Sequence, residues 1–208
     1  MEKLLDGLRK FQNEVYPLHQ DRFQALANTQ SPETLFITCS DSRIDPNLIT
    51  QSNPGELFIC RNAGNIVPPH VHETGGMTAS IEYAVAVLQV KHIVICGHSS
   101  CGAMKASMQP DSVKKLPHVK VWLDHCRAAS EAVSHKHHCD DHDSLDPKYL
   151  DEVTKQNIIL QMNHLKTHPA VFTKLTSNEI MVHGWMYDIE SGNVEMYDDS
   201  LGEFVVVK

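Results

Sequence analysis

Two short segments of the chain carry side chains that could together hold a metal ion. Residues 39–43 read Cys-Ser-Asp-Ser-Arg, and residues 98–101 read His-Ser-Ser-Cys. Two thiolates and one imidazole match a Cys₂His zinc site whose fourth position is open, which is the catalytic rather than the structural pattern. Taken alone, the second segment favours a free thiol beside a buried histidine. Its combination with Cys39 instead indicates a zinc site formed by Cys39, His98 and Cys101.

Asp41 and Arg43 would add a proton acceptor to such a site. A hydroxide activated by a metal needs an acceptor that holds its proton and leaves a lone pair facing the substrate, and the Asp41 carboxylate suits this role. Arg43, on the same side of an extended segment, would keep that carboxylate ionised and fix its direction through charge-assisted hydrogen bonds. The alternative interpretation is an ordinary surface ion pair.

Segments with the pattern of strands bring the two groups to one place. The apolar run 35–38 leads directly to Cys39, and the apolar run 92–96 leads into the loop that holds His98. Both runs have the length of a buried strand. Loops that follow parallel strands emerge at the same edge of a sheet, where ligands of open α/β sheets commonly bind. We therefore expect the two segments to meet at that edge.

The rest of the chain alternates apolar strands with helical patterns. This predicts one α/β domain over 1–208, with a central, mainly parallel sheet covered by helices on both faces. Residues 134–146, rich in His and Asp, predict an exposed loop. The other expected elements are an N-terminal arm of two amphipathic helices (1–28), a strand (56–60), helices (78–88, 117–133 and 148–166) and a C-terminal hairpin (180–187 with 194–197).

Composition excludes several classes of function. The formal net charge is −8, and no basic stripe offsets it, so nucleic acid is not expected as a partner. Charged residues interrupt the first six positions, and no run of about 18 apolar residues occurs, so we expect neither a signal peptide nor a membrane span. Six cysteines in such a chain favour thiols or metal ligands over disulfides, and the expected location is the cytoplasm.

Five motifs together resemble the β-class carbonic anhydrases, in particular bacterial members of cyanate-operon and carboxysomal type. The similarity covers nearly the whole chain. The motifs are the segment 39–43, Arg-Asn-Ala-Gly-Asn at 61–65, Glu-Tyr-Ala-Val at 82–85, Gly-His-Ser-Ser-Cys-Gly at 97–102 and His-Gly-Trp at 183–185.

The resemblance implies a cofactor, a reaction and further site residues. It implies one Zn²⁺ per chain on Cys39, His98 and Cys101, and reversible hydration of carbon dioxide by zinc-bound hydroxide. Asp41 and Arg43 would form the orienting pair, and Gly102 would offer a backbone donor near the substrate. In similar enzymes, residues at the positions of Gln30, Phe58 and Tyr83 line the carbon dioxide pocket at a subunit interface, so a homodimer or tetramer is implied. Phe58 and Tyr83 would otherwise be read as core residues.

Some members of that family close the site by swinging the aspartate, here Asp41, onto the metal as a fourth ligand. The subclass best known for this has a Trp where this chain has Phe36, although its Arg and Tyr partners are present as Arg61 and Tyr187. We therefore predict an open site.

Two other functions share the same residues. Carbonyl sulfide and carbon disulfide are linear and electrophilic like carbon dioxide, so a hydrolase of either is an alternative substrate assignment. A non-catalytic zinc-binding module would need a fourth ligand, for which Cys60, Cys96 and Cys126 are candidates. All three lie in apolar strand or helix patterns, which favours buried, inert thiols.

The segment 135–142, His-Lys-His-His-Cys-Asp-Asp-His, has the composition of a metal-binding tract. No second pair of ligands flanks it at a fixed spacing, so we interpret it as a solvated loop.

Overall fold

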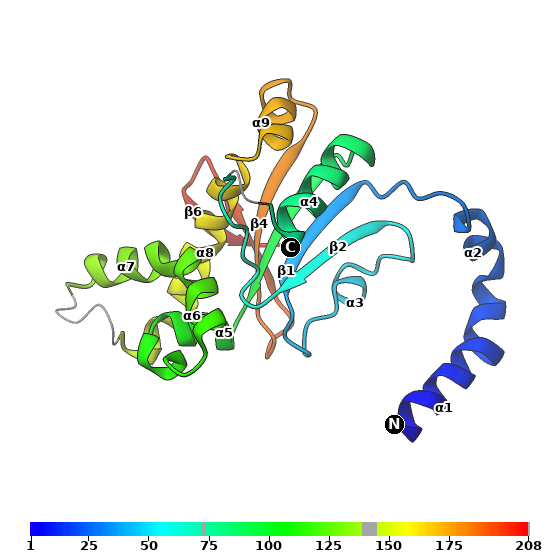
Figure 1. Cartoon of the computed structure of the whole chain (residues 1–208), viewed down its shortest axis with the longest axis horizontal. Coiled ribbons are helices and arrows are strands. Elements are labelled where there is room, and N and C mark those ends of the chain that lie inside the picture. The colour runs from blue at the N-terminus through cyan, green and yellow to red at the C-terminus, as the bar shows by residue number, and fades with distance from the viewer. Residues whose placement is uncertain (72–73, 139–144, 208) are drawn as a thin grey trace.

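The computed structural model describes residues 1–71, 74–138 and 145–207. It has an α/β architecture, in which a six-stranded sheet is flanked by helices and preceded by an N-terminal helical arm (Figure 1). The strands are β1 (Thr34–Cys39), β2 (Leu57–Asn62), β3 (His92–His98), β4 (Met181–Tyr187), β5 (Val194–Asp198) and β6 (Glu203–Val206). The α-helices are α1 (Glu2–Lys10), α2 (Gln20–Leu26), α3 (Pro46–Thr50), α4 (Gly76–Glu82), α5 (Gly102–Ser107), α6 (Pro117–Leu123), α7 (Arg127–Lys136), α8 (Leu150–Leu165) and α9 (Pro169–Thr176). Short π-helical segments (Phe11–Val15 and Tyr83–Val87) and 3₁₀ turns (Tyr16–His19, Pro110–Val113, Asp124–Cys126 and Pro147–Tyr149) extend or connect them.

The sheet order is β2-β1-β3-β4-β5-β6, and the first four of these strands are parallel. β5 and β6 continue the sheet in antiparallel fashion. The sequence prediction of a mainly parallel sheet is therefore confirmed, and the expected C-terminal hairpin is extended by β6. Because β1 and β3 are direct neighbours, Cys39 and His98 end adjacent strands at the same edge of the sheet.

The larger hydrophobic core lies between one face of the sheet and helices α4, α8 and α9. Leu35, Ile37, Ile93 and Ile95 point from β1 and β3 into this core, and all four are fully buried. Their β-branched and apolar side chains suit strands that are covered by helices. This face anchors the two strands that end at Cys39 and His98.

Helix α8 packs closely against β3 and β4 because two glycines face it. A Cβ at Gly97 would lie 2.9 Å from Ile158, and a Cβ at Gly184 would lie 2.7 Å from Met162 and 2.8 Å from Ile158. The absence of side chains at these two positions lets the helix approach the sheet.

The opposite face of the sheet carries a smaller cluster around Phe36. Cross-strand partners place three exposed apolar residues on the same face: Ile59 beside Phe36, Met196 beside Trp185, and Val205 beside Met196. Within one chain, helices α4, α8 and α9 cover one face of the sheet as expected, whereas the opposite face stays partly exposed. Sequence periodicity identifies an apolar face but does not reveal which molecule covers it.

The N-terminal arm projects away from the body of the molecule (Figure 1). None of the residues of α1, α2 or the segments between them is buried. The arm nevertheless carries apolar side chains, among them Leu4, Leu8 and Phe11, which are 72%, 53% and 40% exposed. The expected break near Pro17 appears as the 3₁₀ turn Tyr16–His19.

The expected loop over 134–146 begins later than its composition predicts. Residues 134–136 complete α7, and Ser134 is fully buried because it lies on the side of that helix that faces the protein. Leu145 is also buried, and residues 139–144 lie outside the described part of the chain. Among the described residues, no helix has both the length and the apolar character that crossing a bilayer requires.

Candidate metal centre

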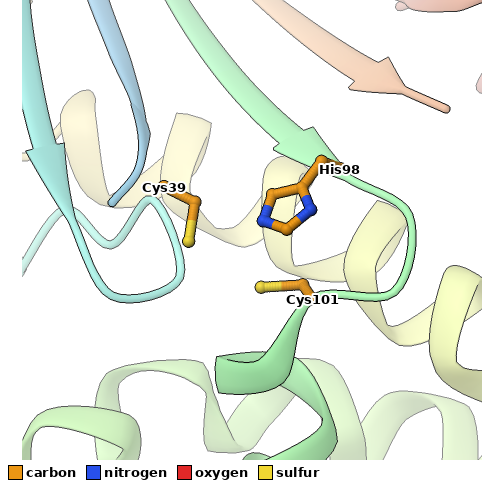
Figure 2. Close-up of side chains that lie close together, drawn as sticks. All are labelled: Cys39, His98 and Cys101. Atoms are coloured by element: carbon orange, nitrogen blue, oxygen red, sulfur yellow. The ribbon is translucent and has the colours of Figure 1, made fainter. Parts of the chain in front are cut away.

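Cys39, His98 and Cys101 converge at the carboxyl edge of the sheet, as the sequence predicts (Figure 2). Cys39 is the last residue of β1, His98 is the last residue of β3, and Cys101 is the N-cap of α5. Their ligand atoms all lie within 4.8 Å of one another, and all three residues are buried. Ser100 has a φ of 55°, so the chain turns sharply and brings Cys101 back toward His98.

The His98 ring is oriented for metal binding by its own neighbour. Its Nδ1 lies 2.9 Å from the carbonyl oxygen of Ser99, and because a carbonyl only accepts, Nδ1 carries the hydrogen. Nε2 is buried and has no hydrogen-bond partner among the described residues. A buried nitrogen lone pair that faces two sulfurs fits a borderline-soft divalent metal, and backbone hydrogen bonding of the other ring nitrogen is the usual support for such a ligand.

The two thiols influence each other strongly. The neighbouring Cys101 thiol, together with the Gly64 N–H that donates to Cys39 Sγ, holds the pKa of Cys39 well below its ordinary value despite its burial. Cys39 in turn raises the pKa of Cys101, and burial adds to this effect. Two adjacent sulfurs resist sharing two negative charges, and a divalent cation between them would remove this opposition. The donor set therefore suits zinc.

The Asp41 carboxylate lies beside the group and is held by Arg43. Arg43 Nε donates to Oδ1 at 2.9 Å and Nη2 donates to Oδ2 at 2.8 Å, while the Arg43 backbone N–H donates to Oδ1 at 3.0 Å. These hydrogen bonds keep the pKa of Asp41 well below its usual range. Asp41 Oδ2 is 3.9 Å from His98 Nε2, so the carboxylate lies near the centre while Arg43 holds both of its oxygens.

Arg61 holds the loop that carries two of these groups. Its Nε donates to the carbonyl oxygen of Cys39 at 3.0 Å, and its Nη2 donates to that of Asp41 at 2.7 Å. The sequence indicated Arg61 only as the first residue of the 61–65 motif and as a feature shared with similar enzymes that close their site. Its contacts with backbone carbonyls leave no signal in the sequence.

The structure does not bring Gln30 and Tyr83 to the metal group of their own chain. Both line an open pocket between the arm and the segment that follows α4, and none of the three converging residues lines that pocket. Phe58 packs against Tyr83, with ring centroids 6.0 Å apart. Gly102 follows Cys101 directly and begins α5, where it is exposed.

The remaining described cysteines stay apart from this centre. Cys60 and Cys96 lie in strands, Cys126 lies in the turn before α7, and none belongs to the converging group. Burial raises the pKa of Cys96 to about 12 and also raises those of Cys60 and Cys126. The fourth ligand that a purely structural zinc site requires is therefore not supplied by these three thiols.

Comparison with known proteins identifies similar chains. Residues 34–194 match the family model described as carbonic anhydrase. The carbonic anhydrase of Pseudomonas aeruginosa is 45% identical over 205 residues, which cover 99% of this chain and 91% of that protein. The solved structure of the β-carbonic anhydrase CcaA superposes with a TM-score of 0.92 at 42% identity, covering 100% of this chain and 99% of that one. A structure from a study of two tetrameric β-carbonic anhydrases of Sordaria macrospora gives a TM-score of 0.72 at 30% identity, covering 94% and 92%.

Proposed function

Because the chain belongs to the β-class carbonic anhydrases and catalyses the reversible hydration of carbon dioxide to bicarbonate and a proton, we propose that Cys39, His98 and Cys101 hold one catalytic Zn²⁺ per chain. The observation that carries this proposal is the convergence of three buried ligand atoms, one of them an imidazole nitrogen to which no described residue offers a hydrogen bond. When bound, zinc supplies the Lewis acidity that yields a nucleophilic hydroxide near neutral pH.

We propose that Asp41 orients the reacting solvent molecule and that Arg43 orients Asp41. A carboxylate oxygen near the metal group can accept a hydrogen bond from that molecule, so that a lone pair of the molecule points toward carbon dioxide. The site is proposed to be open, because both carboxylate oxygens are committed to Arg43 rather than to the metal position. Closure with Asp41 as a fourth ligand would require both of these hydrogen bonds to break.

We propose that a second subunit completes the substrate pocket with Gln30, Phe58 and Tyr83, next to Gly102 of the first. Within one chain, Gln30 and Tyr83 face an open pocket, and Tyr83 is 44% exposed, which is unusual for an aromatic residue that only fills a core. Aromatic side chains would give carbon dioxide an apolar surface and exclude bulk water.

We propose that the chain assembles as a homodimer or tetramer. The arm carries apolar side chains, such as Leu4 and Leu8, that stay exposed within one chain. One face of the sheet likewise leaves Ile59, Met196 and Val205 exposed. Exposed apolar surfaces of this kind mark interfaces in stable assemblies. The relative from Sordaria macrospora is described as tetrameric. We also propose that residues 1–208 form a single domain, and that it works in the cytoplasm, where its five described cysteines would form no disulfides.

The test of the zinc assignment measures carbon dioxide hydration by stopped flow together with the zinc content. We expect about one zinc per chain, loss of activity when a chelator removes it, and recovery when zinc is returned. Cys101→Ser should bind zinc poorly and lose hydration activity, whereas Cys126→Ser, which removes a buried thiol outside the group, should retain both. Full activity in metal-free protein would refute the proposal.

A further inference from the structure

A single peptide group links the indole of Trp122 to the sulfur of Cys39. The Trp122 Nε1–H donates to the carbonyl oxygen of Ala63 at 2.9 Å. The N–H of the same peptide group belongs to Gly64, and it donates to Cys39 Sγ at 3.4 Å. The indole, the peptide and the sulfur therefore form one continuous hydrogen-bonded chain.

Both hydrogen bonds run toward the sulfur, which is the direction that stabilises a thiolate. A donor that binds the carbonyl end of a peptide polarises the group and makes its N–H a stronger donor, by about 10–30% per bond in condensed-phase estimates. The Gly64 N–H strengthened in this way donates to Cys39 Sγ, which is one of the proposed zinc ligands. Hydrogen bonds to coordinating groups orient them and tune how much charge they give to the metal.

The peptide is held firmly enough to transmit such an effect. Gly64 has a φ of +85°, a conformation that favours glycine, and a Cβ there would lie 3.0 Å from Met104 and 3.1 Å from Ala103. On its other side, the Gly64 carbonyl oxygen accepts a hydrogen bond at 3.1 Å from Nδ2 of Asn157, a fully buried residue of α8. Gly64 is thus fixed between Asn157 and the sulfur.

Trp122 reaches this peptide from α6, a separate element from those that supply the ligands. Its ring packs against the apolar cluster that includes Cys39 and Cys101, so its indole is positioned by the same core that surrounds the metal group. Nothing in the α6 sequence distinguishes it from a tryptophan that simply fills a core.

We propose that Trp122 is a positioning residue for the metal centre, acting through the Ala63–Gly64 peptide to fix and polarise the N–H that donates to Cys39. The inference rests on the proposed assignment of Cys39 as a metal ligand. It concerns the indole N–H specifically, and not the bulk of the ring.

Trp185 provides a matched control because it is the other tryptophan of the chain. Its Nε1 is buried and has no hydrogen-bond partner among the described residues, and its ring stands edge-on to Phe36 at 5.8 Å between centroids. Trp185→Phe therefore removes an indole from the protein without removing a hydrogen bond of this kind. Trp122→Phe removes an indole and also its hydrogen bond to the Ala63 carbonyl oxygen.

The experiment uses the full-length protein loaded with Co²⁺, whose absorption bands report directly on thiolate ligands. Trp122→Phe is compared with a shape-preserving variant that carries β-(3-benzothienyl)alanine at position 122, in which sulfur replaces the indole N–H. A thiolate with a weaker hydrogen bond gives its electrons more readily, so the thiolate-to-cobalt charge-transfer band should move to lower energy in both. The affinity for Zn²⁺, measured by competition with a chelator, should fall roughly 10-fold, the low end of what loss of an outer-shell partner causes.

Trp185→Phe should leave the band position and the zinc affinity unchanged. The proposal is overturned if both variants at position 122 are folded by circular dichroism and show the wild-type band, or if Trp185→Phe shifts the band equally. Absence of any thiolate-to-cobalt band in the wild-type protein is a distinct result, because it would refute the ligand set itself and with it the role of Trp122.

Discussion

The guanidinium of Arg43 binds both carboxylate oxygens of Asp41, with Nε 2.9 Å from Oδ1 and Nη2 2.8 Å from Oδ2. Nη2 also lies 3.2 Å from the carbonyl oxygen of Ser100, within the loop between His98 and Cys101. Arg43 therefore ties the carboxylate to the second metal-binding segment as well as to its own. Such a bidentate pair fixes the direction of a carboxylate in a way that a lysine would not.

Asp41→Asn should abolish most of the activity while zinc stays bound. The amide has nearly the same size, but its nitrogen cannot accept a hydrogen bond, so the side chain loses either the contact with Arg43 or the acceptor that faces the reacting solvent molecule. Loss of a group that positions a proton in catalysis typically costs roughly 100-fold or more in turnover. Stopped-flow hydration and metal analysis on the same sample would check this.

Asp45→Asn is the control for that substitution. Asp45 caps α3 by accepting from the Leu48 N–H, and asparagine is an equally good N-cap. We expect normal activity from it. Near-normal turnover in Asp41→Asn would show that Asp41 does not orient the nucleophile.

The positions of the metal-binding side chains could be predicted because they follow local patterns. Apolar runs of strand length lead to Cys39 and into the loop of His98, and parallel strands place their ends at one edge. The Trp122 contact could not be predicted, since it depends on where a loop carbonyl points after folding. Strand β6 was missed because four residues without clear alternation carry too little signal.

Burial within the chain was the least predictable property. Tyr83 reads as part of an apolar helix, yet it is 44% exposed. Phe36 and Ile59 are cross-strand partners on one sheet face, but Phe36 is fully buried and Ile59 is 36% exposed. Hydrophobic patterns indicate that a surface avoids water, and they do not distinguish a core from a subunit interface.

Gly64→Ala should destabilise the protein more than Gly192→Ala. Both residues have a left-handed φ, +85° and +76°, so either alanine pays the backbone cost of about 1–2 kcal/mol. Only at Gly64 would the new methyl also crowd Met104 and Ala103, because Gly192 has open space around it. Urea unfolding of both variants would measure the difference, and equal losses would contradict the crowding.

Acidification below pH 6.5 should lower the stability through His164 and His168. Burial lowers the pKa of both imidazoles from the ordinary value of 6.5, against the opposing effect of hydrogen bonds to the carbonyls of Val67 and Pro68. Between the folded-state pKa values and pH 6.5, the unfolded chain binds more protons than the folded chain. This contribution to stability is therefore complete above pH 6.5 and is lost as the pH falls toward the folded-state values.

Thermal unfolding measured between pH 7.5 and 5.5 would reveal this loss as a fall in Tm with decreasing pH. In a protein of this size, each kcal/mol of lost stability lowers Tm by roughly 2–4 °C. His168→Gln should flatten the slope, whereas His118→Gln, at an exposed position of α6, should leave it as in the wild type. An unchanged slope in His168→Gln would remove this histidine from the explanation.

Leu4→Glu combined with Leu8→Glu should weaken the assembly of subunits. Both leucines lie on the arm and are exposed in one chain, so an interface that buries them gains about 2 kcal/mol for each side chain. Charged replacements lose this gain, and the dissociation constant measured by sedimentation should rise more than 10-fold for each leucine. Because Gln30, Phe58 and Tyr83 are proposed to complete the partner's pocket, hydration activity should fall with the fraction of assembled protein.

Phe172→Glu separates this effect from the general cost of a charge at an apolar position. Phe172 is 58% exposed on α9, on the face of the sheet opposite to Ile59, Met196 and Val205. We expect it to leave both assembly and activity unchanged. If the wild-type protein sediments as a fully active monomer, the pocket cannot be shared between subunits, and Gln30 and Tyr83 must then be explained as ordinary surface residues.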